Sequence, residues 1–148
     1  HIVAAVQLTQ MSYAARPLNY RQWKALQATY ASRTMRWGGV IITLFVIYHL
    51  LHFTFGAVGF APGQYKDMSV YRNVVIGFSV WYVSAFYIAA MVALGLHMYH
   101  GVWSMFQTLG LNTENASRVY RALATVSSAI VVLGNISIPT AVLAGLLK

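Results

Sequence analysis

Apolar positions along the chain are gathered into long blocks, which are separated by short polar connections. Three blocks, residues 37–60, 74–109 and 117–147, are each longer than the roughly 20 residues that a helix needs to cross a bilayer. The first two contain no Lys, Arg, Asp or Glu. A shorter block, residues 1–10, has the pattern of the end of another helix. The sequence therefore predicts a single all-α domain, a transmembrane helical bundle with three full spans and the end of another.

The composition supports a membrane protein and excludes other classes. Hydrophobic residues make up 59% of the 148 positions and charged residues only 8%, whereas about a quarter of the residues in soluble domains are charged. Ten Lys and Arg stand against two Asp and Glu, a balance that can indicate nucleic-acid binding. Because these basic residues lie between apolar blocks, we expect a lipid bilayer and no nucleic acid as the partner.

The distribution of Lys and Arg predicts the orientation in the membrane. Five of the ten lie between residues 11 and 36, which places that connection in the cytoplasm by the positive-inside rule. Residues 60–73 are then outside, residues 110–121 inside, and Lys148 outside.

The chain contains five histidines, and all of them fall on predicted helices: His1, His49, His52, His97 and His100. An ionisable group within a membrane is costly and therefore indicates function. The structural alternative is a neutral imidazole that makes a hydrogen bond between helices. The two pairs with i, i+3 spacing each lie on one helix face, so that one member could bind a cofactor and the other a neighbouring group.

Depth in the membrane separates the histidines into two levels. At a rise of 1.5 Å per residue, His1 lies about 12 Å and His97 about 18 Å from the cytoplasmic ends of their helices, so the two can meet. His49 lies about 20 Å from the cytoplasmic end of its own helix, in the outer half, and we expect its partner on a preceding helix. A haem takes one axial imidazole on each face, and this arrangement therefore favours b-type haem at two levels.

Other cofactors fit the pattern less well. Zinc prefers three or four converging ligands, and neither acidic residue lies within a span. A proton relay or a transporter would more often place an acid at membrane depth. A Rieske-type cluster needs two cysteines, and the chain contains none. A haem-free anchor, whose histidines make hydrogen bonds between helices, remains a second interpretation.

Three stretches, His1–Leu8, Arg36–His49 and Phe86–Ser104, carry a resemblance to a known family. The third is the most specific, because its histidine precedes Gly101-Val-Trp-Ser. In these stretches the chain resembles the membrane-anchor cytochrome b subunit of bacterial succinate dehydrogenase and fumarate reductase, in the class with a single five-helix, di-haem anchor. The family's first helix, with its own haem-binding histidine, would precede residue 1.

The resemblance implies a role for each histidine. His1 and His97 match the iron ligands of the haem nearer the cytoplasm, and His49 matches one ligand of the outer haem. His52 and His100 match no ligand position and become candidates for contacts to the ligands, the propionates or a quinone.

The resemblance also implies partners and a location. Such an anchor lies in the bacterial cytoplasmic (inner) membrane and holds a flavoprotein subunit and an iron–sulfur subunit. Electrons from succinate pass through haem b to menaquinone, and the anchor itself has no dicarboxylate site. The alternatives are another di-haem respiratory cytochrome b, or a haem-free or Rieske-type-cluster anchor of the same complex.

Polar residues near the predicted cytoplasmic interface are candidates for further contacts. Arg33 and Arg36 suit haem propionates, because guanidinium groups pair well with carboxylates, although positive-inside flanking explains them equally. The basic segment from Arg16 to Lys24 is a candidate docking surface for the iron–sulfur subunit. A quinone head group needs hydrogen-bond donors beside an apolar slot, and the candidates are Tyr30, Ser32, Trp103 and Gln107.

Two further sets of residues are weaker candidates. Tyr65, Lys66 and Arg72 could serve a quinone or a propionate on the outer side. Small residues beside the histidines would let either a flat macrocycle or a neighbouring helix approach the backbone. They are Gly38, Gly39, Ala93, Gly95 and Gly101.

Overall fold

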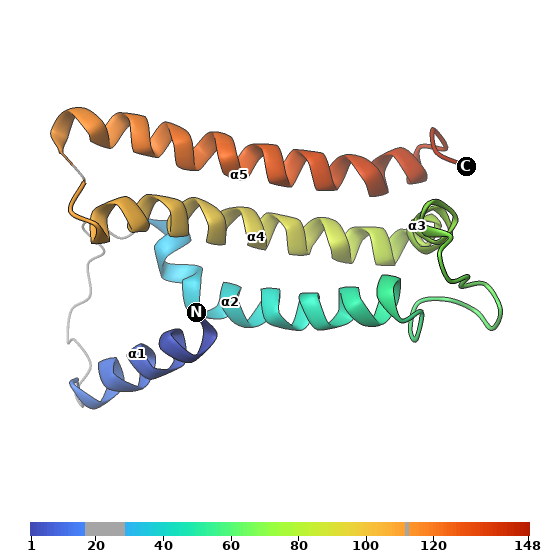
Figure 1. Ribbon diagram of the computed structural model, residues 1–148, viewed down its shortest axis with the longest axis horizontal. Helices are drawn as coiled ribbons and strands as arrows, with labels where there is room; N and C mark the ends of the chain where they lie inside the picture. Colours follow the sequence, from blue (N-terminus) through green and yellow to red (C-terminus); the bar gives the residue numbers. More distant parts are fainter. Residues whose placement is uncertain (17–28, 112) are drawn as a thin grey trace.

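The computed structural model describes residues 1–16, 29–111 and 113–148, except for the side chains of residues 114 and 115. Its helices are α1 (Ile2–Ala14), α2 (Tyr30–His49), the π-helical turn η1 (Leu50–Thr54), α3 (Val70–Ser79), α4 (Trp81–Thr108) and α5 (Glu114–Leu143) (Figure 1). No β-strand occurs within the described ranges. The predicted all-α fold class is confirmed.

Three long helices lie side by side and form the bundle. Tyr30–Thr54, Trp81–Thr108 and Ala116–Leu143 are each long and apolar enough to cross a membrane. The middle helix, α4, packs against both α2 and α5 (Figure 1). A Cβ atom on Gly95 of α4 would lie only 2.5 Å from Cγ2 of Val132 on α5, so this glycine permits a close approach of the two helices.

The ends of the spans differ from the predicted 37–60 and 117–147. The first span begins earlier because Thr29 caps α2, its Oγ1 accepting the Ser32 N–H at 3.1 Å. It ends at Thr54, shortly before Gly56, whose φ of +60° lies in the left-handed region. The last helix begins at Glu114, capped by Thr113, and ends at Leu143. Threonine caps, rather than hydrophobicity, therefore set where these two helices begin.

The predicted helix 74–109 is in fact two helices that meet at Val80. Its backbone is extended there, with φ −86° and ψ 107°, and α3 lies across the end of α4, seen end-on in Figure 1. The buried hydroxyl of Ser84 donates to the carbonyl of Phe78 at 2.7 Å and satisfies a backbone group that the break leaves open. The excess length of this apolar block therefore forms a corner at one end of the bundle.

The connection between η1 and α3 is fastened at the same end. The hydroxyl of Tyr65 donates to the carbonyl of Thr54 at 2.8 Å. The side chain of Asn73 makes two bonds to the backbone of Lys66, at 2.8 and 3.1 Å. These contacts hold the 55–69 segment against η1 and α3.

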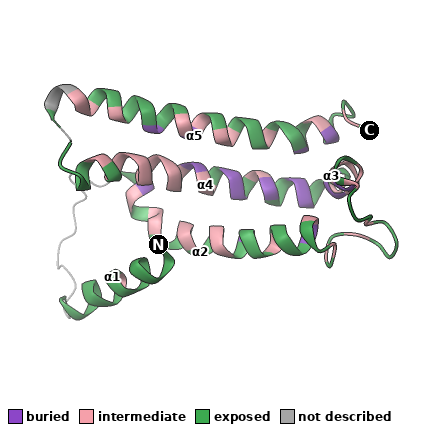
Figure 2. Ribbon diagram, viewed as in Figure 1, coloured by how far each residue is buried: buried purple, intermediate pink, exposed green. Residues whose placement is uncertain are grey.

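Buried residues are concentrated between α2, α3, α4 and the end of α5, whereas α1 has none (Figure 2). Most large apolar residues of the long helices face outward, as lipid-facing surfaces require. The buried hydrophobic cluster comprises Phe45, Phe78, Val83, Tyr87, Ala90, Met91 and Val142.

Candidate functional site

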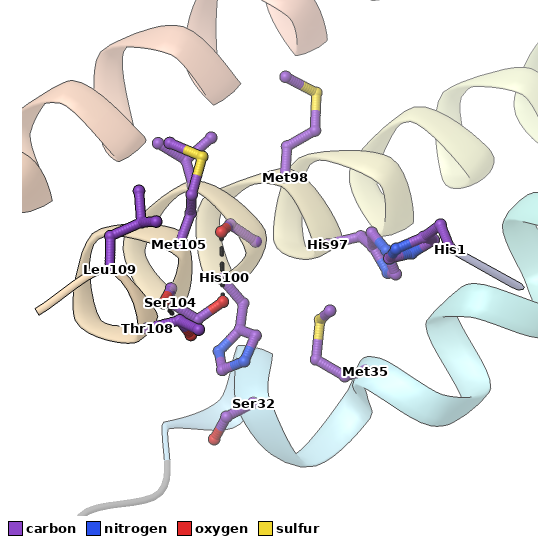
Figure 3. Close-up of a pocket in the computed structure, with 12 residues that line it drawn as sticks. His1, Ser32, Met35, His97, Met98, His100, Ser104, Met105, Thr108 and Leu109 are labelled. Carbon is purple, nitrogen blue, oxygen red and sulfur yellow. Dashed lines mark hydrogen bonds between the residues drawn. The ribbon is translucent and has the colours of Figure 1, made fainter. Parts of the chain in front are cut away.

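His1 and His97 lie next to each other, although 96 positions separate them in the sequence. Their ring centroids are 5.8 Å apart and the ring planes cross at 82°. One imidazole comes from the start of α1 and the other from within α4 (Figure 3). The Nδ1 atom of His97 is buried and has no hydrogen-bond partner in the part of the chain that the structure describes. The structure thus brings together the pair that helix rise had placed at one level.

A groove of about 760 Å³ lies beside this pair. Its hydroxyl groups are occupied by helix backbone: Ser32 donates to Thr29 at 2.9 Å, and Thr108 to Ser104 at 3.0 Å. His100 also lines the groove and points toward Ser32 of α2 (Figure 3). A second groove, of about 250 Å³, includes His97 from between α2 and α4. The larger groove is therefore an apolar surface, and the imidazoles of His1, His97 and His100 are its main polar groups.

The spacing of this pair can be compared with that of two imidazoles that share one iron. Two imidazoles bound on opposite sides of one metal through bonds of about 2 Å would have ring centroids roughly 6 Å apart. The 5.8 Å separation of His1 and His97 agrees with this value. The Nδ1 atom of His97, without a hydrogen-bond partner among the described residues, and the adjoining groove are further features that a bound group would meet. Gly39 allows α2 to lie beside the site, since a Cβ there would be 3.8 Å from Cε1 of His97.

His49 lies elsewhere, at the end of α2, and its side chain is exposed. Its ring contacts Phe45, Phe53 and Tyr87, with centroids 6.0, 5.8 and 6.0 Å away. Within residues 1–16, 29–111 and 113–148, no ring contact joins it to another histidine. The structure therefore separates His49 from the His1–His97 pair.

His52 is fully buried, in contrast to His49 one turn earlier. Its Nδ1 shares a hydrogen bond of 3.0 Å with the hydroxyl of Tyr87, and its buried Nε2 has no partner within residues 1–16, 29–111 and 113–148. Tyr87 is not among the candidate residues that the sequence predicts. The available signal was a phenol inside an apolar span, because a buried Tyr hydroxyl usually has a hydrogen-bond partner.

A profile of the succinate dehydrogenase/fumarate reductase transmembrane subunit family matches residues 13–136, with His49, His52, His97 and His100 inside the match. The chain belongs to this family. It is thus a membrane-spanning subunit of such a complex, associated with the catalytic subunits and the lipid bilayer. Searches of the curated proteins and of the solved structures return no significant match.

The other predicted contacts of this anchor subunit lie partly outside the grooves. Arg33 and Arg36 are exposed, and Arg36 lies 5.0 Å from the ring centroid of Tyr13 on α1. Among the quinone candidates, Ser32 lines the larger groove and Tyr30 the smaller. Trp103 instead lies beneath the guanidinium of Arg121, at 4.7 Å.

The remaining candidates are also placed in part. Gln107 is exposed on the last turns of α4. Tyr65, Lys66 and Arg72 fasten the segment that joins η1 to α3, and Arg72 donates to the carbonyl of Gln64. In the proposed docking segment of the anchor, Arg16 is described, whereas the remaining positions through Lys24 lie outside the described residues.

The small residues divide between the two expected roles. Gly95 packs against Val132, as close helix packing requires, and Gly39 faces His97. Ala93 lines the smaller groove. An added Cβ on Gly38 or Gly101 would have no heavy atom within 4 Å among the described residues.

Proposed function

We propose that this anchor subunit carries electrons from the iron–sulfur subunit to menaquinone through haem b, with His1 and His97 as the axial ligands of one haem. The observation that carries the proposal is the meeting of these two imidazoles from separate helices, 5.8 Å apart beside a groove. Bound haem would supply a one-electron carrier between the clusters and the quinone. The proposed setting is the bacterial cytoplasmic membrane.

The protein's own part is to fix the imidazoles in an apolar environment. His97 is partly buried on α4, the helix that packs against both of its neighbours, whereas His1 is exposed. Met35, Met98 and Met105 line the groove and keep the surroundings of the site apolar. Burial and the contacts of the ligands set the reduction potential of such a centre.

His49 is the proposed ligand of a second haem, with its other ligand on a preceding helix. Support comes from its exposed ring, which has Phe45, Phe53 and Tyr87 on its inner side. The exposed side of the ring is open to another helix of the assembled complex.

The proposed quinone position is the part of the larger groove near His100. A quinone head group needs one or two donors beside an apolar slot, and an imidazole that points toward Ser32 supplies one donor. His100 could equally bind a haem propionate, and both roles place an oxygen acceptor in the same part of the groove.

The test is a dithionite-reduced minus oxidised optical spectrum of the purified complex, with pyridine haemochrome quantification against protein. We expect about two b-type haems per anchor, one lost in His97→Ala and one lost in His49→Ala. Tyr82→Phe, at an exposed position on the same helix as His97, is the control and should keep both haems. A complex without a b-type signal would refute the proposal.

A haem-free anchor is the second candidate, and one observation favours it. The bond between His52 and Tyr87 joins η1 to α4, which is the structural use of a histidine within a membrane. In such an anchor, the same spectrum would show no haem, and His97→Ala would change stability alone.

A further inference from the structure

His52 and His49 contact the same two aromatic rings. Phe53 lies 5.8 Å from the ring of His49 and stacks on His52 at 4.1 Å, with an interplanar angle of 28°. Tyr87 lies 6.0 Å from His49 and 5.7 Å from His52. Phe53 and Tyr87 also contact each other, at 5.6 Å. The buried histidine therefore contacts two of the rings that pack against the exposed one.

The side chain of His52 is fixed from several sides. Phe60 packs against it at 4.9 Å, in addition to the stacked Phe53. A Cβ on Gly59 would lie 2.6 Å from its ring, and one on Gly77 would lie 3.0 Å from its Nε2. Two backbone segments thus lie directly against this imidazole. It has no room to turn toward a bound group, and its ring holds the Tyr87 hydroxyl at 3.0 Å.

The π-helical turn explains why the two histidines differ. An i, i+3 pair on an α-helix would share one face. Leu50–Thr54 is wound as a π-helix, which changes the direction of the following side chains. His52 is consequently buried while His49 is exposed. π-Helical turns occur frequently at functional sites, because they redirect individual side chains.

We infer that the His52–Tyr87 hydrogen bond positions the imidazole of His49, and that His52 is a positioning residue and not an iron ligand. The inference rests on the proposed function of His49. Tyr87 contacts the ring of His49 at an interplanar angle of 61°, so a displaced Tyr87 would let that ring rotate. Contacts behind a metal-binding histidine fix its orientation and tune the metal.

The experiment uses the assembled complex with four substitutions, Tyr87→Phe, His52→Gln, His49→Ala and, as the control, Tyr82→Phe. Tyr82 lies on the same helix as Tyr87, but its side chain is exposed. Pyridine haemochrome analysis counts the haems. Low-temperature electron paramagnetic resonance gives the largest g value of each ferric haem, and redox titration gives each midpoint potential.

We expect Tyr87→Phe and His52→Gln to keep the haem count of the wild type. Both should shift the g value and the midpoint potential of the haem that His49→Ala removes, and leave the other haem unchanged. Tyr82→Phe should shift neither. Tyr87→Phe removes a single oxygen atom, so it decides the question even if His52→Gln does not assemble.

Two outcomes overturn the inference alone. One is a Tyr87→Phe spectrum identical to that of the wild type, and the other is a haem lost in an assembled His52→Gln complex, which would make His52 a ligand. If His49→Ala keeps every haem, or the wild type has none, the proposed function fails and the inference falls with it. The His49→Ala measurement therefore separates the two failures.

Discussion

Gly77 of α3 faces the buried Nε2 of His52, and a Cβ on this glycine would lie 3.0 Å from that nitrogen and 2.9 Å from Cε1 of Phe53. A glycine within a helix usually costs about 1 kcal/mol relative to alanine. At this position, the absence of a side chain is what allows α3 to pack against η1.

Gly77→Ala should therefore destabilise the anchor, although alanine is the better helix former. Overpacking of a filled site costs about 1–3 kcal/mol, which exceeds the gain in helix propensity. Thermal unfolding of the detergent-solubilised complex measures the effect. Gly134→Ala in α5 is the matched control, because its added Cβ has no heavy atom within 4 Å among the described residues. Equal or higher stability of Gly77→Ala would contradict the packing argument.

Position 39 should accept an alanine side chain but no larger one. A Cβ at this position would lie 3.8 Å from Cε1 of His97, which is ordinary van der Waals contact. Gly39→Ala should therefore keep the wild-type haem count, whereas Gly39→Leu should displace the His97 ring and lose the same haem as His97→Ala. Haemochrome analysis of the two variants tests this, and a full haem count in Gly39→Leu would show that α2 does not lie against the site.

The proximity of His1 and His97 could be predicted from the sequence because it depends on the rise per residue of an α-helix, which is nearly constant. Helix rise and the positions of Arg and Lys place both residues at one depth. The corner at Val80 was beyond sequence reasoning, since neither Gly nor Pro lies at that position and the break depends on the Ser84 contact. The separation of His49 from His52 was equally inaccessible, because it requires the π-helical turn.

The corner between α3 and α4 should depend on one hydroxyl. Ser84 is fully buried, and Ser84→Ala would leave the Phe78 carbonyl without its 2.7 Å bond. A buried polar group that loses its partner costs about 1–3 kcal/mol, and the melting temperature of the complex should fall accordingly. Ser137→Ala removes a similar bond at an exposed site, to the Gly134 carbonyl, and should change stability little. Equal effects of the two substitutions would show that burial of the corner does not matter.

We expect the contact between Gly95 and Val132 to limit how closely α4 can approach α5. Gly95→Ala would place a Cβ 2.5 Å from Cγ2 of Val132, and valine has little rotamer freedom in a helix with which to relieve the clash. We expect a loss of about 1–3 kcal/mol, recovered in part by adding Val132→Ala, which removes the opposing methyl groups. A double-mutant cycle measured by thermal unfolding should then show coupling between the two positions. Additive effects of the two substitutions would show that the distance between α4 and α5 does not depend on this contact.

The orientation predicted from Lys and Arg can be tested directly, because the chain contains no native cysteine. Met68 is 97% exposed in the segment that precedes α3, and Leu111 is exposed at the opposite end of the bundle. In a bacterial host, a membrane-impermeant maleimide should label Met68→Cys in intact spheroplasts and Leu111→Cys only in permeabilised cells. Five of the ten basic residues fall in the connection between residues 11 and 36, which the sequence predicts to be cytoplasmic together with residues 110–121, so the positive-inside rule requires this result. The reverse labelling pattern would show that the anchor has the opposite orientation. The His1–His97 pair would then lie in the half of the membrane remote from the cytoplasm.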